Sequence, residues 1–258
     1  MNMENEIRTR LSMAEKERNV RILYAVESGS RAWGLASPDS DYDVRFVYVR
    51  PAEEYLRIDE SPDFIEWQLD DVYDINGWDL GKALRQLSKG NAVFFEWLNS
   101  PVVYRVSDEW ETVRRAAENY FSVKATLRHY CGLAKNTFLT CLSQQEKVSC
   151  KKYFYALRPL LAARYIDNCH EPPPVEFAEL MKQELPEELR TAIKHLLDIK
   201  LTTGEKEKLP AIPVISRFIE NELNSCCEVS AAAPDDRNRD SSELNKVFRE
   251  IVLHSRKL

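Results

Sequence analysis

The stretch VRILYAVESGSRAWGLASPDSDYDVRFVY, residues 20–48, decides the fold that we expect of this chain. It opens with the apolar run 22–26, which predicts a buried strand. The pair Gly29-Ser30 and about one helical turn of residues follow, and a second apolar run occupies 44–49. The stretch therefore predicts a strand, a turn with a short helix, a second turn and a second strand.

Two carboxylates, Asp41 and Asp43, stand at the head of the second predicted strand. Residues i and i+2 of a strand point to the same face, so these two side chains are expected side by side. Carboxylates that close repel each other unless a cation lies between them, and a hard divalent ion, Mg²⁺ or Mn²⁺, suits such oxygen ligands. The alternative is a surface turn capped by aspartates, which are common before strands.

The Gly29-Ser30 turn is a candidate phosphate-binding site. Its backbone N–H groups and the serine hydroxyl can donate to phosphate oxygens, helped by the N-terminus of the short helix that follows. Arg31 could also reach a phosphate, because a guanidinium group matches phosphate oxygens in pairs; a salt bridge on the helix surface is the alternative. A turn for phosphates, ten residues before a carboxylate pair for a metal, is a specific arrangement.

At these residues the chain resembles the nucleotidyltransferases of the DNA polymerase β superfamily, whose signature is G-S, ten residues, then D-x-D. The fuller strings GSRAWG and SDYDVR resemble a bacterial and phage branch of predicted nucleotidyltransferases associated with RNA repair. Later pieces match the same branch, so the resemblance spans about residues 20–166: VYDINGWDLGKAL, KGNAVFFEWLNSP and KKYFYALRPLLAARYI. The resemblance implies two-metal transfer of a nucleotide from an NTP.

The resemblance also implies a third carboxylate, which holds the ion that activates the attacking hydroxyl group. We predict Asp74 for this role, because it lies on a short strand expected at 72–75, ahead of a helix expected at 78–89. The competing acids are Asp70, Asp71 and Asp79. The second of these could belong to a turn, and the third suits the first turn of a helix, where the macrodipole favours an acid.

A helix expected at about 146–167 carries basic and aromatic side chains along one line. They stand at i, i+4 and i+7, with one neighbour of the first: Lys151, Tyr155, Arg158 and Lys152. Such a face could bind a triphosphate and stack on a base, or it could be an ordinary solvated face. The match to the RNA-repair branch favours nucleotide binding. Lys82, on the helix expected at 78–89, is a further candidate, with a solvated lysine as the alternative.

The whole pattern predicts an α+β protein: a small mixed β-sheet with flanking helices, followed by an all-helical C-terminal region. We expect residues 1–106 to form a catalytic domain and 107–258 a helical domain, of which 107–170 would complete the nucleotide site. The segment EPPPV, 171–175, is typical of a rigid spacer. Nothing after it carries recognisable chemistry.

Composition limits the class of protein. The chain has 258 residues, of which 44% are hydrophobic and 30% charged, as is ordinary for a soluble globular protein. No apolar run approaches the ~18 residues of a membrane span. Six cysteines without a C-x-x-C pair favour a reducing cytosol over a disulfide framework or a zinc site. We therefore expect a cytoplasmic protein without a membrane segment.

The acceptor is the open part of the prediction. The resemblance suggests an RNA 3′ end or a tRNA, but a net charge of −6 requires that any polynucleotide be bound by a local basic patch. Transfer to a protein hydroxyl, as in AMPylation, is the second possibility, and a nucleotide-binding module without catalysis is the third. The three predicted carboxylates argue against the last. The sequence identifies neither the NTP nor the oligomeric state.

Overall fold

The computed structural model describes residues 3–143, 145–203 and 208–254, and the chain divides into two compact units. The first contains residues 3–29, 41–121 and 237–254. The second contains the described residues of 30–40 and 122–236. Each unit is therefore assembled from segments that are far apart in the sequence. The division into a catalytic domain, 1–106, and a helical domain, 107–258, stays a prediction about function.

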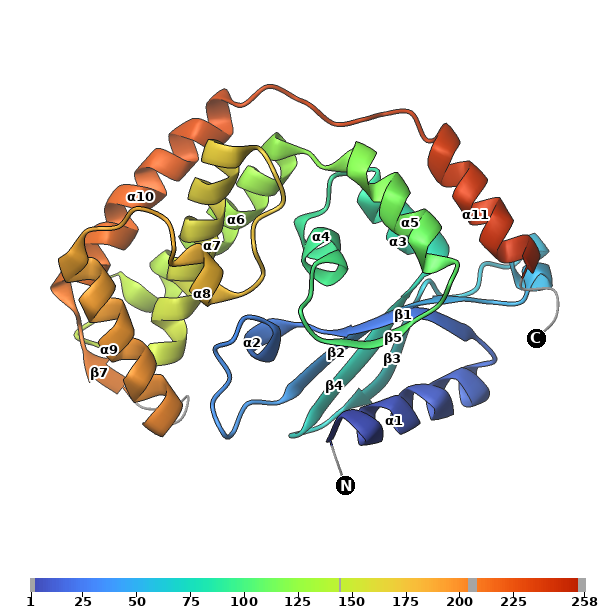
Figure 1. Cartoon of the computed structure of the whole chain (residues 1–258), viewed down its shortest axis with the longest axis horizontal. Helices are drawn as coiled ribbons and strands as arrows, with labels where there is room; N and C mark the ends of the chain where they lie inside the picture. The colour runs from blue at the N-terminus through green and yellow to red at the C-terminus, as the bar shows by residue number, and fades with distance from the viewer. Residues whose placement is uncertain (1–2, 144, 204–207, 255–258) are drawn as a thin grey trace. The chain divides into compact units, whose positions relative to one another are not determined.

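A five-stranded mixed sheet in the order β3-β4-β2-β1-β5 forms the centre of the first unit (Figure 1). Its strands are β1 (Arg21–Glu27), β2 (Tyr42–Val49), β3 (Phe64–Leu69), β4 (Tyr73–Asp79) and β5 (Val103–Val106). β2 runs parallel to β4, and the other neighbouring strands pair antiparallel. β4 is longer than the predicted strand 72–75, because Trp78 and Asp79 pair with β2 instead of starting the next helix.

Apolar side chains cover both faces of this sheet. On one face, α1 (Met3–Arg18) buries Ile7 and Leu11 together with Phe46 of β2. On the other face, Val47 of β2 packs with residues of four helices: α3 (Leu80–Leu87), α4 (Ala92–Leu98), α5 (Trp110–Ala117) and α11 (Ser242–His254). Because alternate residues of β2 point to opposite faces and both faces are covered, the strand is a nearly continuous apolar run.

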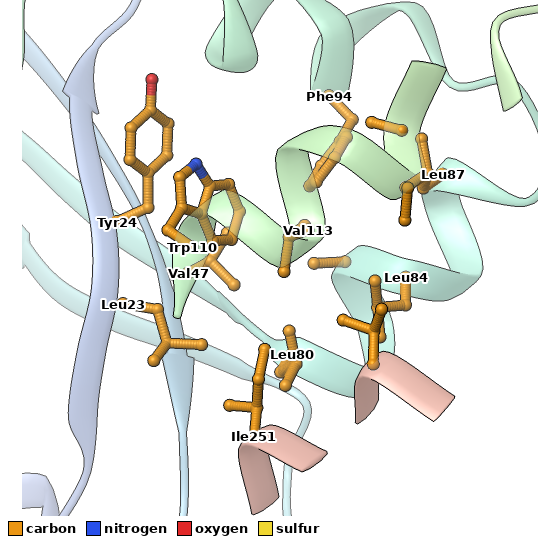
Figure 2. Packing of buried hydrophobic residues seen from close by; sticks show 14 of the residues in the cluster. Leu23, Tyr24, Val47, Leu80, Leu84, Leu87, Phe94, Trp110, Val113 and Ile251 are labelled. Carbon is orange, nitrogen blue, oxygen red and sulfur yellow. The ribbon is translucent and has the colours of Figure 1, made fainter. Parts of the chain in front are cut away.

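Figure 2 shows the packing on the face that α3, α4, α5 and α11 cover. The ring of Trp110 in α5 stacks on Tyr24 of β1, with ring centroids 4.5 Å apart and an interplanar angle of 10°. Ile251 of α11 joins the same cluster, so the C-terminal helix is part of the core of the sheet unit. The described part of this unit also contains the 3₁₀ helices η1 (Ala52–Leu56) and η2 (Glu118–Tyr120).

The second unit is mainly helical (Figure 1). Its helices are α6 (Val123–Thr137), α7 (Cys150–Cys169), α8 (Phe177–Leu180), α9 (Glu187–Thr203) and α10 (Pro213–Ala232), with a π-helical turn η3 (Phe138–Leu142). A short two-stranded sheet, β6 (Lys147–Ser149) with β7 (Lys208–Pro210), lies among them and was not predicted. The predicted α+β class with a helical C-terminal region is confirmed. Among the described helices, none combines the length and the apolar character of a membrane span.

Candidate functional site

Two of the predicted metal ligands lie side by side on neighbouring strands. Asp43 of β2 is the direct partner of Asp74 in the parallel pairing with β4. Both carboxylates contact one guanidinium group: Nη2 of Arg45 lies 3.1 Å from Asp43 Oδ1 and 2.6 Å from Asp74 Oδ2. The structure thus brings Asp43 and Asp74 together, as the sequence predicted. Their role as metal ligands stays a prediction.

Arg45 is fixed by backbone acceptors as well as by the carboxylates. Its Nη1 donates to the carbonyl oxygens of Asp74, at 2.6 Å, and of Val44, at 3.1 Å. The Arg45 side chain is only 16% exposed, and a charge removed from water in this way needs such partners. Sequence reasoning missed this residue. The available signal was a charge two positions after Asp43, on the same strand face, inside an otherwise apolar run.

Asp41 immediately precedes β2 and is exposed. Within the described residues, no group of three or more His, Cys, Asp or Glu side chains is arranged to hold a metal ion. The two paired carboxylates of this site, Asp43 and Asp74, are bridged by Arg45. The predicted set of three aspartates is therefore seen in the structure as a close pair, with Asp41 at the adjoining end of β2.

Gly29, the first residue of the predicted phosphate turn, lies directly against Asp43. Its φ is +60°, in the left-handed region that glycine adopts without strain. A Cβ at this position would lie 2.0 Å from Asp43 Oδ2. The N–H of the preceding Ser28 donates to the carbonyl of Asp43 at 2.8 Å. The position accordingly requires glycine, and the turn begins beside the carboxylate pair.

Glu27, the last residue of β1, is a second residue that sequence reasoning missed. It is 1% exposed, and its Oε1 accepts the backbone N–H of Asp43 at 2.9 Å. The hydroxyl of Tyr104 donates to Oε2, and the hydroxyl of Ser100 donates to the Glu27 carbonyl at 2.6 Å. These bonds fix the backbone from which β2 presents Asp43. The signal in the sequence was an acid at the end of a buried apolar run.

The three acids considered as alternatives to Asp74 lie at a helix cap or in a turn. Asp79 caps α3 at the opposite end of β4, where it accepts the Gly81 N–H and the Tyr55 hydroxyl, both at 2.7 Å. Asp70 accepts backbone N–H groups in the turn before β4, and Asp71 is exposed in the same turn. Of the four acids considered, Asp74 is the direct strand partner of Asp43.

Asp79 has a testable effect on the pH dependence of stability. Burial raises the pKa of its carboxyl group above the ordinary value, against the hydrogen bonds from Tyr55 and Gly81, which act to lower the pKa. The folded protein therefore binds more protons than the unfolded chain, so the Asp79 contribution to stability falls as pH rises from about 4 through the raised pKa. We expect Asp79→Asn, which keeps an acceptor for Gly81, to flatten this fall in urea unfolding measured from about pH 4 to 7. An unchanged slope would contradict the assignment.

Lys82, a predicted nucleotide contact, is not near the carboxylate pair along β4. Its Nζ lies 3.1 Å from Asp63 Oδ1, and it stacks over the ring of Phe64 at 5.2 Å. The carbonyl of Asp63 accepts the N–H of Asp79, at the far end of β4. At about 3.3 Å per strand residue, that end is roughly 16 Å from Asp74. The extension of β4 beyond the predicted strand is what separates Lys82 from Asp74.

The predicted phosphate contacts after Gly29 belong to the second unit. Ser30 is 5% exposed, and its carbonyl accepts the Leu35 N–H at 2.8 Å. Nη2 of Arg31 donates to the carbonyl of Ser40 at 2.6 Å. This side chain therefore connects the two ends of the loop 30–40, whose first residues lie in the short helix α2 (Gly29–Ala32). Whether these residues bind phosphate stays a prediction.

The predicted basic face of α7 forms a row of stacked groups with Trp33. The Arg158 guanidinium carbon lies 4.3 Å from the Trp33 ring centroid, and the Tyr155 ring meets Trp33 edge-on at 5.5 Å. Nζ of Lys151 lies 5.6 Å from the Tyr155 centroid, and Lys152 is exposed. Arg158 is 2% exposed, and its guanidinium group also donates to the carbonyl of Val175. Its role as a nucleotide contact stays a prediction.

The chain matches, over residues 3–250, the model of the RNA repair pathway DNA polymerase beta family, RlaP. It belongs to this family. "Uncharacterized protein YcgL" of Bacillus subtilis (strain 168) is 39% identical over 252 residues, which are 97% of this chain and 96% of that protein. A crystal structure of a nucleotidyltransferase-like protein from Exiguobacterium sibiricum 255-15 aligns at 14% identity and a TM-score of 0.33, over 96% of this chain and 80% of that one.

Membership of the RNA repair pathway DNA polymerase beta family confirms the resemblance that the sequence suggested. Family and fold together point to a nucleotidyltransferase of the polymerase β type. For such a protein, the carboxylates of Asp43 and Asp74 beside the Gly29 turn form the candidate active site of the sheet unit.

Proposed function

We propose that this protein transfers a nucleoside monophosphate from an NTP to an acceptor hydroxyl group and releases pyrophosphate. The observation that carries the proposal is the pairing of Asp43 with Asp74 across β2 and β4, next to a glycine turn that leaves no room for a side chain. The family is described by its RNA repair pathway, so we propose an RNA 3′ end, including that of a tRNA, as the acceptor.

The residues present fit a hard divalent cation, Mg²⁺ or Mn²⁺. Asp43 and Asp74 offer carboxylate oxygens, the ligand type that such ions prefer. Asp41, which immediately precedes β2, is the proposed further ligand. The tight fit of Gly29 against Asp43 Oδ2 brings the proposed phosphate turn to the same carboxylate. When bound, such ions stabilise charge on the transferred phosphoryl group and activate the attacking hydroxyl.

The chain itself contributes positioning, which in reactions of this kind supplies much of the rate. Glu27 holds the backbone N–H of Asp43, and Arg45 offsets the repulsion between Asp43 and Asp74. The Gly29-Ser30 turn is proposed to donate to the β- and γ-phosphates. Five further side chains are proposed as nucleotide contacts: Arg31, Lys151, Lys152, Tyr155 and Arg158.

The direct test is incorporation of each labelled NTP into a pool of short RNAs and tRNAs, with Mg²⁺, with Mn²⁺ or with EDTA. We expect a metal-dependent product one or more nucleotides longer at the 3′ end, with release of one pyrophosphate for each nucleotide added. Periodate oxidation of the RNA, which destroys the 3′-terminal diol, should abolish the product. Labelled protein in place of RNA would identify a protein hydroxyl as the acceptor. NTP binding without turnover on any acceptor would contradict the proposal.

Arg45→Met tests whether Arg45 and a divalent cation share the same carboxylates. Loss of the guanidinium leaves two half-buried carboxylates facing each other, so the metal-free variant should lose about 2 kcal/mol of stability. Mg²⁺ should restore part of this loss, because it replaces the missing positive charge. Thermal unfolding with and without Mg²⁺ measures both effects.

The control for this prediction is Arg8→Met, which removes an exposed ion pair with Glu4 on α1. Surface pairs contribute little, so this variant should lose less than about 1 kcal/mol, with no dependence on Mg²⁺. A loss of stability in Arg45→Met that is equal with and without Mg²⁺ would contradict a shared site.

A further inference from the structure

The loop 30–40 is hydrogen-bonded to α8 and α9, two helices for which the sequence predicts no chemical role. The backbone N–H of Phe177, at the start of α8, donates to the carbonyl of Trp33 at 2.9 Å. Nζ of Lys200 in α9 donates to the carbonyl of Leu35 at 2.6 Å. Both anchors come from the chain after residue 171. The helical region is thus a support for the loop that begins with Ser30.

Lys200 is an unusual residue for the interior of a helical unit, at 1% exposure. Lysine is almost never fully buried, because its ammonium group loses hydration, and such a group is retained only where polar partners replace the water. The Leu35 carbonyl is such a partner. A bond between a charged donor and a carbonyl is among the stronger hydrogen bonds of a protein interior.

Leu35 links Lys200 to the proposed phosphate turn. Its carbonyl accepts from Lys200, while its own N–H donates to the carbonyl of Ser30 at 2.8 Å. The N–H of Gly34 donates to the carbonyl of Arg31 at 3.2 Å, which closes the same short loop. The ammonium group of Lys200 therefore fixes Leu35, the last residue of the hydrogen-bonded segment 30–35 at the start of the loop.

We propose that Lys200 is a positioning residue for the NTP phosphates: it holds Leu35 so that the Ser30 hydroxyl and the N–H groups of the turn keep their phosphate-binding arrangement. This inference rests on the proposed function and adds a residue of α9 to it. Small displacements of groups that position a substrate weaken binding and catalysis strongly. Lys200 acts through Leu35 and does not contact the nucleotide.

The experiment compares Lys200→Met, which removes the donor, with Lys200→Arg, which keeps a cationic donor. Lys194→Met, at an exposed position of the same helix, is the matched control. Hydrogen exchange of peptides covering 30–40 should be faster in Lys200→Met, with peptides of the sheet unit unchanged. The KM for the NTP should rise about tenfold or more, with a smaller change in kcat, and Lys200→Arg should recover most of this loss.

The outcomes separate this inference from the proposed function. A wild-type protein that neither binds nor turns over any NTP contradicts the proposed function, whatever the exchange rates of 30–40. An NTP-binding wild type with an unchanged KM in Lys200→Met contradicts the role of Lys200 alone, as does an equal loss in Lys194→Met. If Lys200→Met does not fold, Lys200→Gln, which keeps a neutral donor, takes its place in the same comparison, with the same results expected.

Discussion

Asp43→Asn should lower the rate of nucleotidyl transfer by on the order of 10³-fold or more. Asp43 lies against both Asp74 and Gly29. In the proposed reaction it would be a metal ligand and would also lie beside the phosphate turn. Asparagine keeps the shape of the side chain and removes the charge. Losing a ligand of this kind removes several kcal/mol of transition-state stabilisation, and each 1.36 kcal/mol is a factor of about ten. Single-turnover incorporation of labelled NTP into RNA measures the effect.

Two further variants show whether this loss belongs to the site. Asp71→Asn changes an exposed acid in the turn before β4 and should leave the rate within about twofold, as a surface substitution usually does. Asp74→Asn should approach the loss of Asp43→Asn, since the two carboxylates are strand partners. Folded Asp43→Asn protein with a near wild-type rate would refute the active site proposed here.

The central strands, and a carboxylate on the strand beside Asp43, could be predicted from the sequence. Gly29-Ser30 and the two aspartates, Asp41 and Asp43, lie between two apolar runs that each predict a buried strand. Such a local pattern can be recognised without knowledge of the tertiary contacts. The resemblance implies an acid on a neighbouring strand ahead of a helix, and Asp74 is the acid that fits this pattern. The parallel register places Asp74 directly beside Asp43, and its role as a metal ligand stays a prediction.

Glu27 and Arg45 were missed because their importance depends on partners distant in the sequence. Glu27 accepts from the backbone of Asp43 and from Tyr104, and Arg45 joins Asp43 to Asp74. In the sequence, Glu27 is only a charged residue at the end of an apolar run, and Arg45 only a charged residue within one. The predicted end of β4 is wrong for a related reason. The helical spacing of the leucines in α3 predicts a helix from Trp78, but Trp78 pairs with β2 and α3 begins at Leu80.

The contacts between the chain after residue 171 and the loop 30–40 could not be predicted from the sequence, for a different physical reason. Its contacts to the loop 30–40 go to the carbonyl oxygens of Trp33 and Leu35, and every residue has such an oxygen. The pairing of Phe177 and Lys200 with this loop is therefore independent of the side chains on the accepting residues. Only the burial of Lys200 singles it out, and burial requires the fold.

Gly29→Ala should lower nucleotidyl transfer by on the order of 10²-fold while the sheet unit stays folded. The added Cβ would lie 2.0 Å from Asp43 Oδ2, and a backbone φ of +60° is strained for alanine. The carboxylate or the turn must therefore move, and either movement changes the geometry that the proposal requires. The rate and the NTP affinity measured on the same preparation separate a displaced carboxylate from a displaced phosphate turn.

Two other glycines separate the collision with Asp43 from backbone strain. Gly34 has φ +70°, but no described atom lies within 4 Å of a Cβ built there, so Gly34→Ala carries the strain without the collision. Gly132 of α6 has neither, and Gly132→Ala should be neutral or stabilise the helix by up to about 1 kcal/mol. If Gly34→Ala lowers the rate as much as Gly29→Ala, strain in the loop explains the loss. If only Gly29→Ala lowers it, the close approach of turn and carboxylate is what the reaction needs.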